Sequence, residues 1–309
     1  MQADQESTEN TAIVPAILFK YRADTELTEK VITGAKIWLP TAETLNDPLE
    51  CKTGIIPKDW QQQQIREMEQ GQLMGLFGFP GAESRETLFS LDRKQTRKWF
   101  KRLKKLPFDR KIKAMRSLYG DHGIELSDPR LIFKTLEKQL SSMGIFSLSD
   151  CPDNQPMWAH YAGDHTGIAL GFSTAEGSKL SDPRHTFPVV YDTRKPVFEK
   201  GFLHEIQFYR TEAGGMRSLS KFSFDDPVLR AAVTTKPPAW SYEREWRYVE
   251  ESSGLHDFPG ELVSVIFGYR MSEQRRNYYR KLLRSAGRNV ELFEVYISSS
   301  GSFDIKSCR

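Results

Sequence analysis

Residues 144–172 read GIFSLSDCPDNQPMWAHYAGDHTGIALGF and contain two apolar runs separated by a segment rich in turn residues. The first run, 144–149, predicts a strand, and 155–161 predicts a short helix. In 167–172 apolar residues occupy every second position, which is the pattern of a half-buried strand. A strand, a short helix and a second strand therefore form the centre of the predicted fold.

The same patterns continue on both sides of this stretch. Further strands are predicted at 13–21, 36–40, 187–191, 246–249, 262–267 and 290–297. Helices are predicted at 27–33, 61–72, 96–118 with a break at Pro107, 128–143, 226–233 and 272–286. Strands dominate the two ends of the chain and helices its middle, which predicts an α+β fold. We interpret 57–142 as a helical insertion or cap within a single catalytic-type domain, 13–309, that follows a disordered tail, 1–12.

Composition excludes several classes of protein. Of the 309 residues 39% are hydrophobic and 28% are charged, and no run approaches the ~20 apolar residues of a membrane-spanning helix. The polar N-terminus lacks the apolar core of a secretory signal. The three cysteines, Cys51, Cys151 and Cys308, form no CxxC pair. We therefore expect no structural metal site, no disulfide framework, and a reducing, cytoplasmic location.

Positive charge is concentrated in one segment. Residues 93–116 contain twelve lysines and arginines and one acid, a charge of +11, whereas the rest of the chain has 32 basic and 40 acidic residues, a charge of −8. This segment could bind RNA, DNA or another acidic partner through Arg97, Lys98, Lys101, Arg102, Lys104 and Lys105. The alternative is a solvated helix face above buried Trp99 and Phe100.

Residues 240–247, WSYEREWR, carry two carboxylates that could do chemistry. In an extended segment Glu243 and Glu245 would share a face, where like charges repel unless a positive or reactive group lies between them. In a catalytic interpretation Glu245 stabilises a developing cation and Glu243 orients or deprotonates a nucleophile. The alternative is two solvated acids paired with Arg244 and Arg247.

Other candidate ligand-binding residues lie on the predicted strands. Tyr21 and Arg22 end the first strand, and an arginine fork suits phosphate or carboxylate. Ser147 and Ser149 alternate along a later strand and could hydrogen-bond a ribose.

The short helix adds two aromatic residues, and known motifs are absent. Trp158 and Tyr161 are neighbours on one helix face, where they could hold an aromatic ring or belong to the core. His160 and His165 lack the spacing of a helical metal pair. The chain contains neither the dinucleotide-binding glycine fingerprint nor the P-loop.

Several short elements together resemble a bacterial family known as domain of unknown function 2971. They are FKYR at 19–22, LNDPLE at 45–50, FSLS at 146–149, MWAHY at 157–161 followed by 167–172, and Lys236 with 240–247. The resemblance extends over roughly residues 17–300 and implies no particular activity.

The chain also resembles, more distantly, the arginine-serine-glutamate class of ADP-ribosyltransferases. The elements that carry this resemblance occur in the order Arg22, Ser147-x-Ser149 and Glu243-x-Glu245. It implies a split β core with a helical insertion, and NAD as the substrate. The protein would be a transferase or an NAD glycohydrolase, in a toxin or phage-defence setting with an antitoxin or defence-system partner.

The same resemblance implies a role for each site residue. Glu245 would stabilise the oxocarbenium-like ribose as the bond to nicotinamide breaks, and Glu243 would position the acceptor. Arg22 would hold the pyrophosphate or a ribose, and Trp158 or Tyr161 would stack on nicotinamide.

Two other functions are compatible with the sequence. The protein could be a nucleic-acid-binding module without catalysis that uses the basic helices of 93–116. It could also be a metal-dependent nuclease in which Asp47, Glu50, Glu243 and Glu245 hold Mg²⁺.

Overall fold

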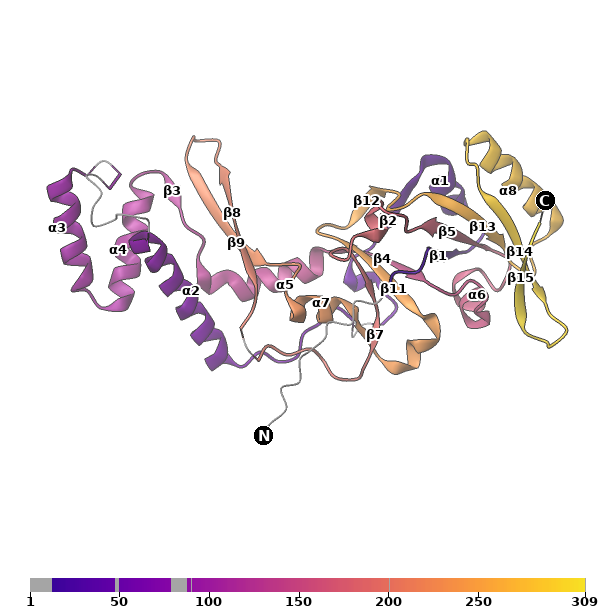
Figure 1. The fold of residues 1–309 in the computed structure, drawn as a ribbon, viewed down its shortest axis with the longest axis horizontal. Helices are drawn as coiled ribbons and strands as arrows, with labels where there is room; N and C mark the ends of the chain where they lie inside the picture. Colours follow the sequence, from indigo (N-terminus) through magenta and orange to yellow (C-terminus); the bar gives the residue numbers. More distant parts are fainter. Residues whose placement is uncertain (1–12, 48–49, 79–87, 90, 200, 309) are drawn as a thin grey trace. The chain divides into compact units, whose positions relative to one another are not determined.

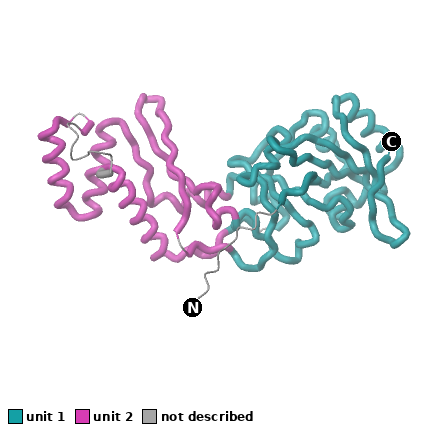
Figure 2. Tube along the Cα trace, viewed as in Figure 1, with its two compact units in different colours: residues 1–52, 141–195, 231–309 teal, residues 53–140, 196–230 magenta. Residues whose placement is uncertain are grey.

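The structure, a computed structural model, describes residues 13–47, 50–78, 88–89, 91–199 and 201–308 (Figure 1). The predicted disordered tail, 1–12, lies outside the described residues. The chain forms two compact units, coloured separately in Figure 2. Unit 1 comprises residues 1–52, 141–195 and 231–309, and unit 2 comprises residues 53–140 and 196–230. The predicted insertion thus corresponds to the first segment of unit 2, and the prediction did not include the second.

An eight-stranded sheet forms the centre of unit 1. Its strands, in spatial order, are β15 (Phe303–Ser307), β14 (Glu291–Ile297), β13 (Leu262–Phe267), β5 (Ile168–Ser173), β1 (Ile17–Arg22), β4 (Gly144–Ser149), β11 (Glu245–Glu250) and β6 (Thr186–Pro188). Only β13 and β14 are parallel, and all other neighbours are antiparallel. The predicted α+β class is confirmed, while an ADP-ribosyltransferase-like core remains a prediction.

Helices cover both faces of this sheet. The helices α1 (Glu26–Gly34) and α8 (Glu273–Ser285) contribute to an apolar core that includes Trp246 and Tyr248 of β11. On the other face, α6 (Gln155–Tyr161) packs against residues of β1, β5, β13 and β14. Because side chains alternate along a strand, Glu245 and Arg247 of β11 point away from the Trp246 face.

The sheet opens between two neighbouring inner strands, β1 and β4. Both strands pair along six residues with their outer neighbours, β5 and β11. Between them, only Phe19 and Ser149 are in register. Backbone groups beyond this pair must therefore find other partners or solvent, and the candidate site lies at this opening.

Two-stranded pairs and short turns complete unit 1. β2 (Lys36–Leu39) pairs with β12 (Gly254–Asp257), and β7 (Val190–Tyr191) pairs with β10 (Thr235–Lys236). Single-turn 3₁₀ helices lie at η1 (Ala42–Thr44) and η3 (Lys179–Ser181), and η4 (Pro238–Glu243) leads directly into β11.

Unit 2 combines helices with a small sheet. It contains α2 (Lys58–Gly78), α3 (Arg93–Lys104), α4 (Phe108–Gly120), η2 (Pro129–Leu131) and the strands β3 (Ile124–Glu125), β9 (Met216–Phe222) and β8 (His204–Arg210). The helices α5 (Ile132–Ser142) and α7 (Pro227–Thr234) each cross a boundary between the units. The predicted break at Pro107 is confirmed, because Pro107 directly precedes α4. The β8–β9 pair was not predicted. Among the described residues, no helix has both the length and the apolar character needed to cross a membrane.

Candidate functional site

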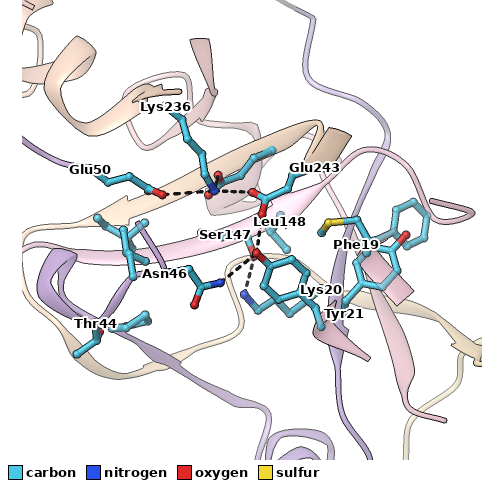
Figure 3. Close-up of a pocket in the computed structure, with 16 residues that line it drawn as sticks. Phe19, Lys20, Tyr21, Thr44, Asn46, Glu50, Ser147, Leu148, Lys236 and Glu243 are labelled. Atoms are coloured by element: carbon cyan, nitrogen blue, oxygen red, sulfur yellow. Dashed lines mark hydrogen bonds and ion pairs between the residues drawn. The ribbon is translucent and has the colours of Figure 1, made fainter. Parts of the chain in front are cut away.

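A cavity of about 210 Å³ lies at the opening between β1 and β4, entirely within unit 1 (Figure 3). β1 contributes Phe19, Lys20 and Tyr21 to its wall, and β4 contributes Ile145 and Ser147. The remaining polar and aromatic lining comes from other segments of unit 1: Thr44, Asn46, Glu50, Tyr161, Lys236, Glu243 and Glu245.

A sharp backbone turn directs the two predicted carboxylates into this cavity. Glu243 ends the 3₁₀ helix η4, and Glu245 begins β11. Arg244 between them has a left-handed conformation, with φ of 47°, which is strained for a side chain with a Cβ atom. Its guanidinium binds Asp150 at 2.6 Å, which holds the turn in place. The predicted extended geometry is therefore wrong, although the two carboxylates do converge.

The group between the carboxylates is the ammonium of Lys236. Its Nζ lies 2.5 Å from Oε2 of Glu243, 3.0 Å from Oε2 of Glu245 and 3.4 Å from Oε1 of Glu50. It also lies 4.8 Å from the ring centre of Trp240, within cation–π range. All four charged side chains are buried. The alternative interpretation of two solvated acids is therefore wrong.

Arg247 holds the opposite side of the same carboxylates. Its side chain is 0% exposed, and its Nε donates to Oε1 of Glu245 at 2.9 Å. Its terminal nitrogens donate to Glu50 and to the backbone carbonyl of Val233. A fully buried guanidinium is tolerated because each side of its planar fork finds an acceptor.

The cluster has more negative than positive groups. Glu50, Glu243 and Glu245 oppose Lys236 and Arg247, so the fully ionised cluster carries a charge of −1. Burial would raise the pKa of Glu245, but Arg247 and Lys236, with a hydrogen bond from Ser147, hold it below its ordinary value. Burial raises the pKa of Glu50 despite the same two cations. Burial also disfavours the charge on Lys236, yet the three carboxylates raise its pKa.

Tyr161 brings a neutral donor to the cavity. Its hydroxyl donates to Oε1 of Glu243 at 2.5 Å and accepts from the side-chain amide of Asn46 at 3.0 Å. Burial and the bond to Glu243 raise the pKa of this phenol, so it keeps its proton at neutral pH. Tyr161 lines the cavity, and its contact with a ligand stays a prediction.

Lys20 is the cation of the cavity wall that has no carboxylate partner among the described residues. Its Nζ donates to the backbone carbonyl of Ser147 at 2.8 Å, across the opening between β1 and β4. Burial and the nearby charge of Arg22 lower the pKa of Lys20 to about 8, against the opposing effect of Glu245. The ammonium thus remains mostly charged at neutral pH and retains hydrogen atoms to donate.

Other predicted site residues have structural partners. Ser149 is 0% exposed, and its hydroxyl donates to the carbonyl of Glu243 at 2.7 Å. Tyr21 lines the cavity, while its hydroxyl donates to the carbonyl of Cys151 at 2.6 Å. The Ser149 bond helps to fix the turn that carries the carboxylates.

Trp158 and Arg22 do not line the cavity. Trp158 is fully buried, its ring nitrogen donates to the carbonyl of Pro152, and it packs edge-on against Tyr21. This packing leaves no face of the indole for a ligand. The Nε of Arg22 donates to Thr28 of α1 at 3.1 Å. Arg22, which we predicted to bind a phosphate or ribose, therefore contacts α1 and not the cavity.

The six basic residues predicted to bind nucleic acid belong to unit 2 and line no part of this cavity: Arg97, Lys98, Lys101, Arg102, Lys104 and Lys105. Three of the four carboxylates proposed for a magnesium site, all except Asp47, surround an ammonium instead. Lys236 Nζ occupies the centre that a cation would need between Glu50, Glu243 and Glu245, so a metal would have to displace it.

Sequence reasoning considered Arg247 only as a partner of solvated acids, and assigned no role at this site to Lys20, Asn46 or Lys236. Each belongs to an element that carries the resemblance to the domain of unknown function family, and that co-occurrence was the available signal. Charge alone could not select them, because the chain has 44 lysines and arginines.

Comparison with known proteins gives one partial match. Curated proteins and solved structures both yielded no match to the chain. The matched segment of the family model is shorter than the predicted 17–300, and it includes Tyr161, Lys236, Glu243 and Glu245 but not Lys20 or Glu50. Residues 157–248 match the family described as "Protein of unknown function (DUF2971)".

Proposed function

We propose that unit 1 cleaves the bond between nicotinamide and ribose in NAD, and transfers ADP-ribose to an acceptor or to water. The observation that carries this proposal is the charge arrangement of the cavity. An ionised Glu245, in a cluster of net charge −1, lines one part of the wall, and the ammonium of Lys20 lines another.

This arrangement matches the charge changes of the reaction. As the C1′–N bond breaks, its electron pair goes to nicotinamide, which leaves as a neutral molecule, and the ribose becomes oxocarbenium-like. A carboxylate already held near the ribose stabilises that positive charge without reorganising. The acceptor then uses a lone pair to bond C1′ and releases a proton to Glu243 or to solvent.

The size and lining of the cavity suit one end of NAD. A volume of about 210 Å³ is smaller than the ~300–1,000 Å³ that encloses a drug-sized ligand. Phe19, Tyr21 and Tyr161 supply aromatic surface for the nicotinamide ring. The rest of the dinucleotide would extend out of the opening.

Lys20 takes the role that the resemblance gives to Arg22. The Arg22 guanidinium binds Thr28, whereas the Lys20 ammonium lines the cavity and, among the described residues, donates only to a backbone carbonyl. Lys20 is thus suited to bind the phosphate next to the nicotinamide ribose. The opening between β1 and β4 also supports the split β core that the resemblance implies.

The direct test is to incubate the full chain with NAD and to quantify free nicotinamide by chromatography. We expect release in the wild type and a loss of at least ~10²-fold in Glu245→Gln, by the scale of lost transition-state electrostatics. Glu261→Gln, at an exposed position, is the matched control and should keep full activity. No release above the rate of a buffer blank would refute the proposal.

Glu245→Gln also removes a partner of Arg247 and Lys236, so its fold must be checked by circular dichroism. Tyr161→Phe gives a second variant that changes a single hydroxyl. It should lower nicotinamide release, because Glu243 loses a hydrogen bond inside the cavity. Full activity in both variants would exclude this cavity as the site of cleavage.

A further inference from the structure

The helices α3 and α4 of unit 2 form a hairpin with a one-sided surface. A short connection through Leu106 and Pro107 joins them. Their apolar side chains, including Phe100, Leu103 and Met115, are buried in one core cluster. The opposite side therefore consists almost entirely of the cations of this segment.

Most of these cations are exposed and unpaired. Arg97, Lys98, Lys101, Arg102 and Lys105 are all exposed. Within the part of the chain that the structure describes, none of these five forms an ion pair or hydrogen bond through its side chain. The cluster of charge is therefore not used to stabilise unit 2, and like charges at i and i+4 on a helix are destabilising.

The local structure stabilises the helix backbone that carries these cations. Asp92 and Gln95 form a capping box at the start of α3, which fixes the first turn. Lys101 and Arg102 lie in the last turn, where positive charge is favoured by the helix dipole. At a rise of 1.5 Å per residue, the twelve residues of α3 extend over about 18 Å.

We propose that this hairpin, residues 93–113, binds the phosphate backbone of a nucleic-acid duplex without reading its sequence. The five exposed cations, four on the ~18 Å of α3 and Lys105 directly after it, can contact about five phosphates of a duplex. Backbone contacts by lysine and arginine position a protein on a duplex but carry no sequence information.

The composition of the surface favours this partner over others. In 91–130, all of which the structure describes, no large hydrophobic side chain is exposed. Insertion into a membrane surface requires apolar side chains beside the cations. Protein interfaces depend on buried aromatic and apolar anchors, and single-stranded nucleic acids are held by exposed aromatics that stack on bases. The hairpin has neither apolar anchors nor exposed aromatic rings on its surface.

The test compares two variants of the full chain with equal net charge. The first replaces four hairpin cations: Lys98→Gln, Lys101→Gln, Arg102→Gln and Lys105→Gln. The control replaces four exposed cations elsewhere: Lys30→Gln, Lys58→Gln, Lys281→Gln and Arg284→Gln. Each variant lowers the formal charge from +3 to −1, so only the position of the lost charge differs.

Binding is measured by fluorescence anisotropy with a labelled 20-base-pair DNA duplex over a range of salt concentrations. For the wild type we expect a slope of log K against log salt of about −4.5, from five phosphate contacts. The hairpin variant should bind on the order of 10³-fold more weakly at 0.1 M salt, with a slope close to −1, since each of the four lost contacts contributes about 8-fold there. The control should stay within about 3-fold of the wild type.

Several outcomes would overturn the proposal. They are an absence of duplex binding by the wild type at 50 mM salt, equal losses in the two variants, or tighter binding to phosphatidylserine vesicles or polyglutamate than to the duplex. Tighter binding to a single-stranded RNA of the same length would refute the assignment to a duplex. None of these readouts depends on NAD cleavage.

Discussion

Replacing Lys236 with methionine tests the charge cluster of unit 1 most directly. The ammonium lies between 2.5 and 3.4 Å from three buried carboxylates. Methionine keeps an unbranched side chain of similar length but removes the charge. Removing one partner of a buried ion pair generally costs ~3–5 kcal/mol, because the other charge stays buried without compensation. With three carboxylates affected, we expect Lys236→Met to reach the upper end of this range at pH 7.5.

The pH dependence of this variant has a definite sign. Without Lys236, burial and repulsion from Glu245 raise the pKa of Glu50 in the folded protein further above the ~4.3 of an unfolded glutamate. The folded state then binds more protons than the unfolded state as the pH falls, so lower pH stabilises the variant. The variant should therefore regain part of its lost stability between pH 7.5 and pH 5. That gain disappears again as the pH rises through the folded pKa.

The assay is urea unfolding followed by tryptophan fluorescence at pH 7.5 and pH 5. Lys179→Met is the control, because Lys179 forms an exposed ion pair with Glu250 and should cost less than ~1 kcal/mol. Adding Glu243→Gln to Lys236→Met should restore part of the loss by removing one unpaired charge. A loss below ~1 kcal/mol at pH 7.5, or a further loss at pH 5, would refute the reasoning.

Three other predictions test separate parts of the structure. Lys20→Met should raise the KM for NAD at least ~10-fold with a smaller change in kcat, and Lys20→Arg should restore the KM. In the wild type, the KM for NAD should increase at pH values above about 8, because Lys20 then loses its proton. An unchanged KM in Lys20→Met would contradict the proposed phosphate contact. Trp158→Ala should lower the free energy of unfolding by ~3–5 kcal/mol, because the indole is fully buried, and a thermal melt that shifts by less than a few degrees would count against its place in the core. Burial raises the pKa of both Cys51 and Cys151 to about 11, so neither should react quickly with a thiol reagent in the native protein at pH 7.4; fast labelling of Cys51 would contradict its burial.

Regular elements were predictable where one side of a strand or helix is buried. The strands at 144–149 and 262–267 and the helix at 155–161 appear at the predicted residues, because alternation or helical spacing of apolar residues reflects a buried face. The prediction missed the strand β8, which has no buried face. All seven of its residues are exposed, so burial imposes no pattern on them.

The predicted carboxylates do lie in a cavity, but Lys236, the cation between them, could not be predicted. Glu243 and Glu245 were selected from their spacing, whereas the ammonium between them comes from a different short strand. The sequence also does not indicate in which direction a side chain at the end of a strand points. Arg22 ends β1 as expected, but its guanidinium binds α1, and neighbouring Lys20 lines the cavity instead.

The same uncertainty affected the aromatic pair of α6. Trp158 and Tyr161 lie on one helix face, yet one is sealed in the core and the other meets the cavity. A helical stripe predicts that a face is covered, but it does not distinguish packing from contact with a ligand.

The connectivity of unit 1 has a consequence for how the protein is made. Glu50 emerges from the ribosome 197 residues before Arg247, the guanidinium that neutralises it, and both segments of unit 2 are translated in between. During that interval the nascent chain carries an acid whose native environment cannot yet exist. Contacts between such distant positions form slowly, so we expect unit 1 to acquire its native structure only near the end of synthesis.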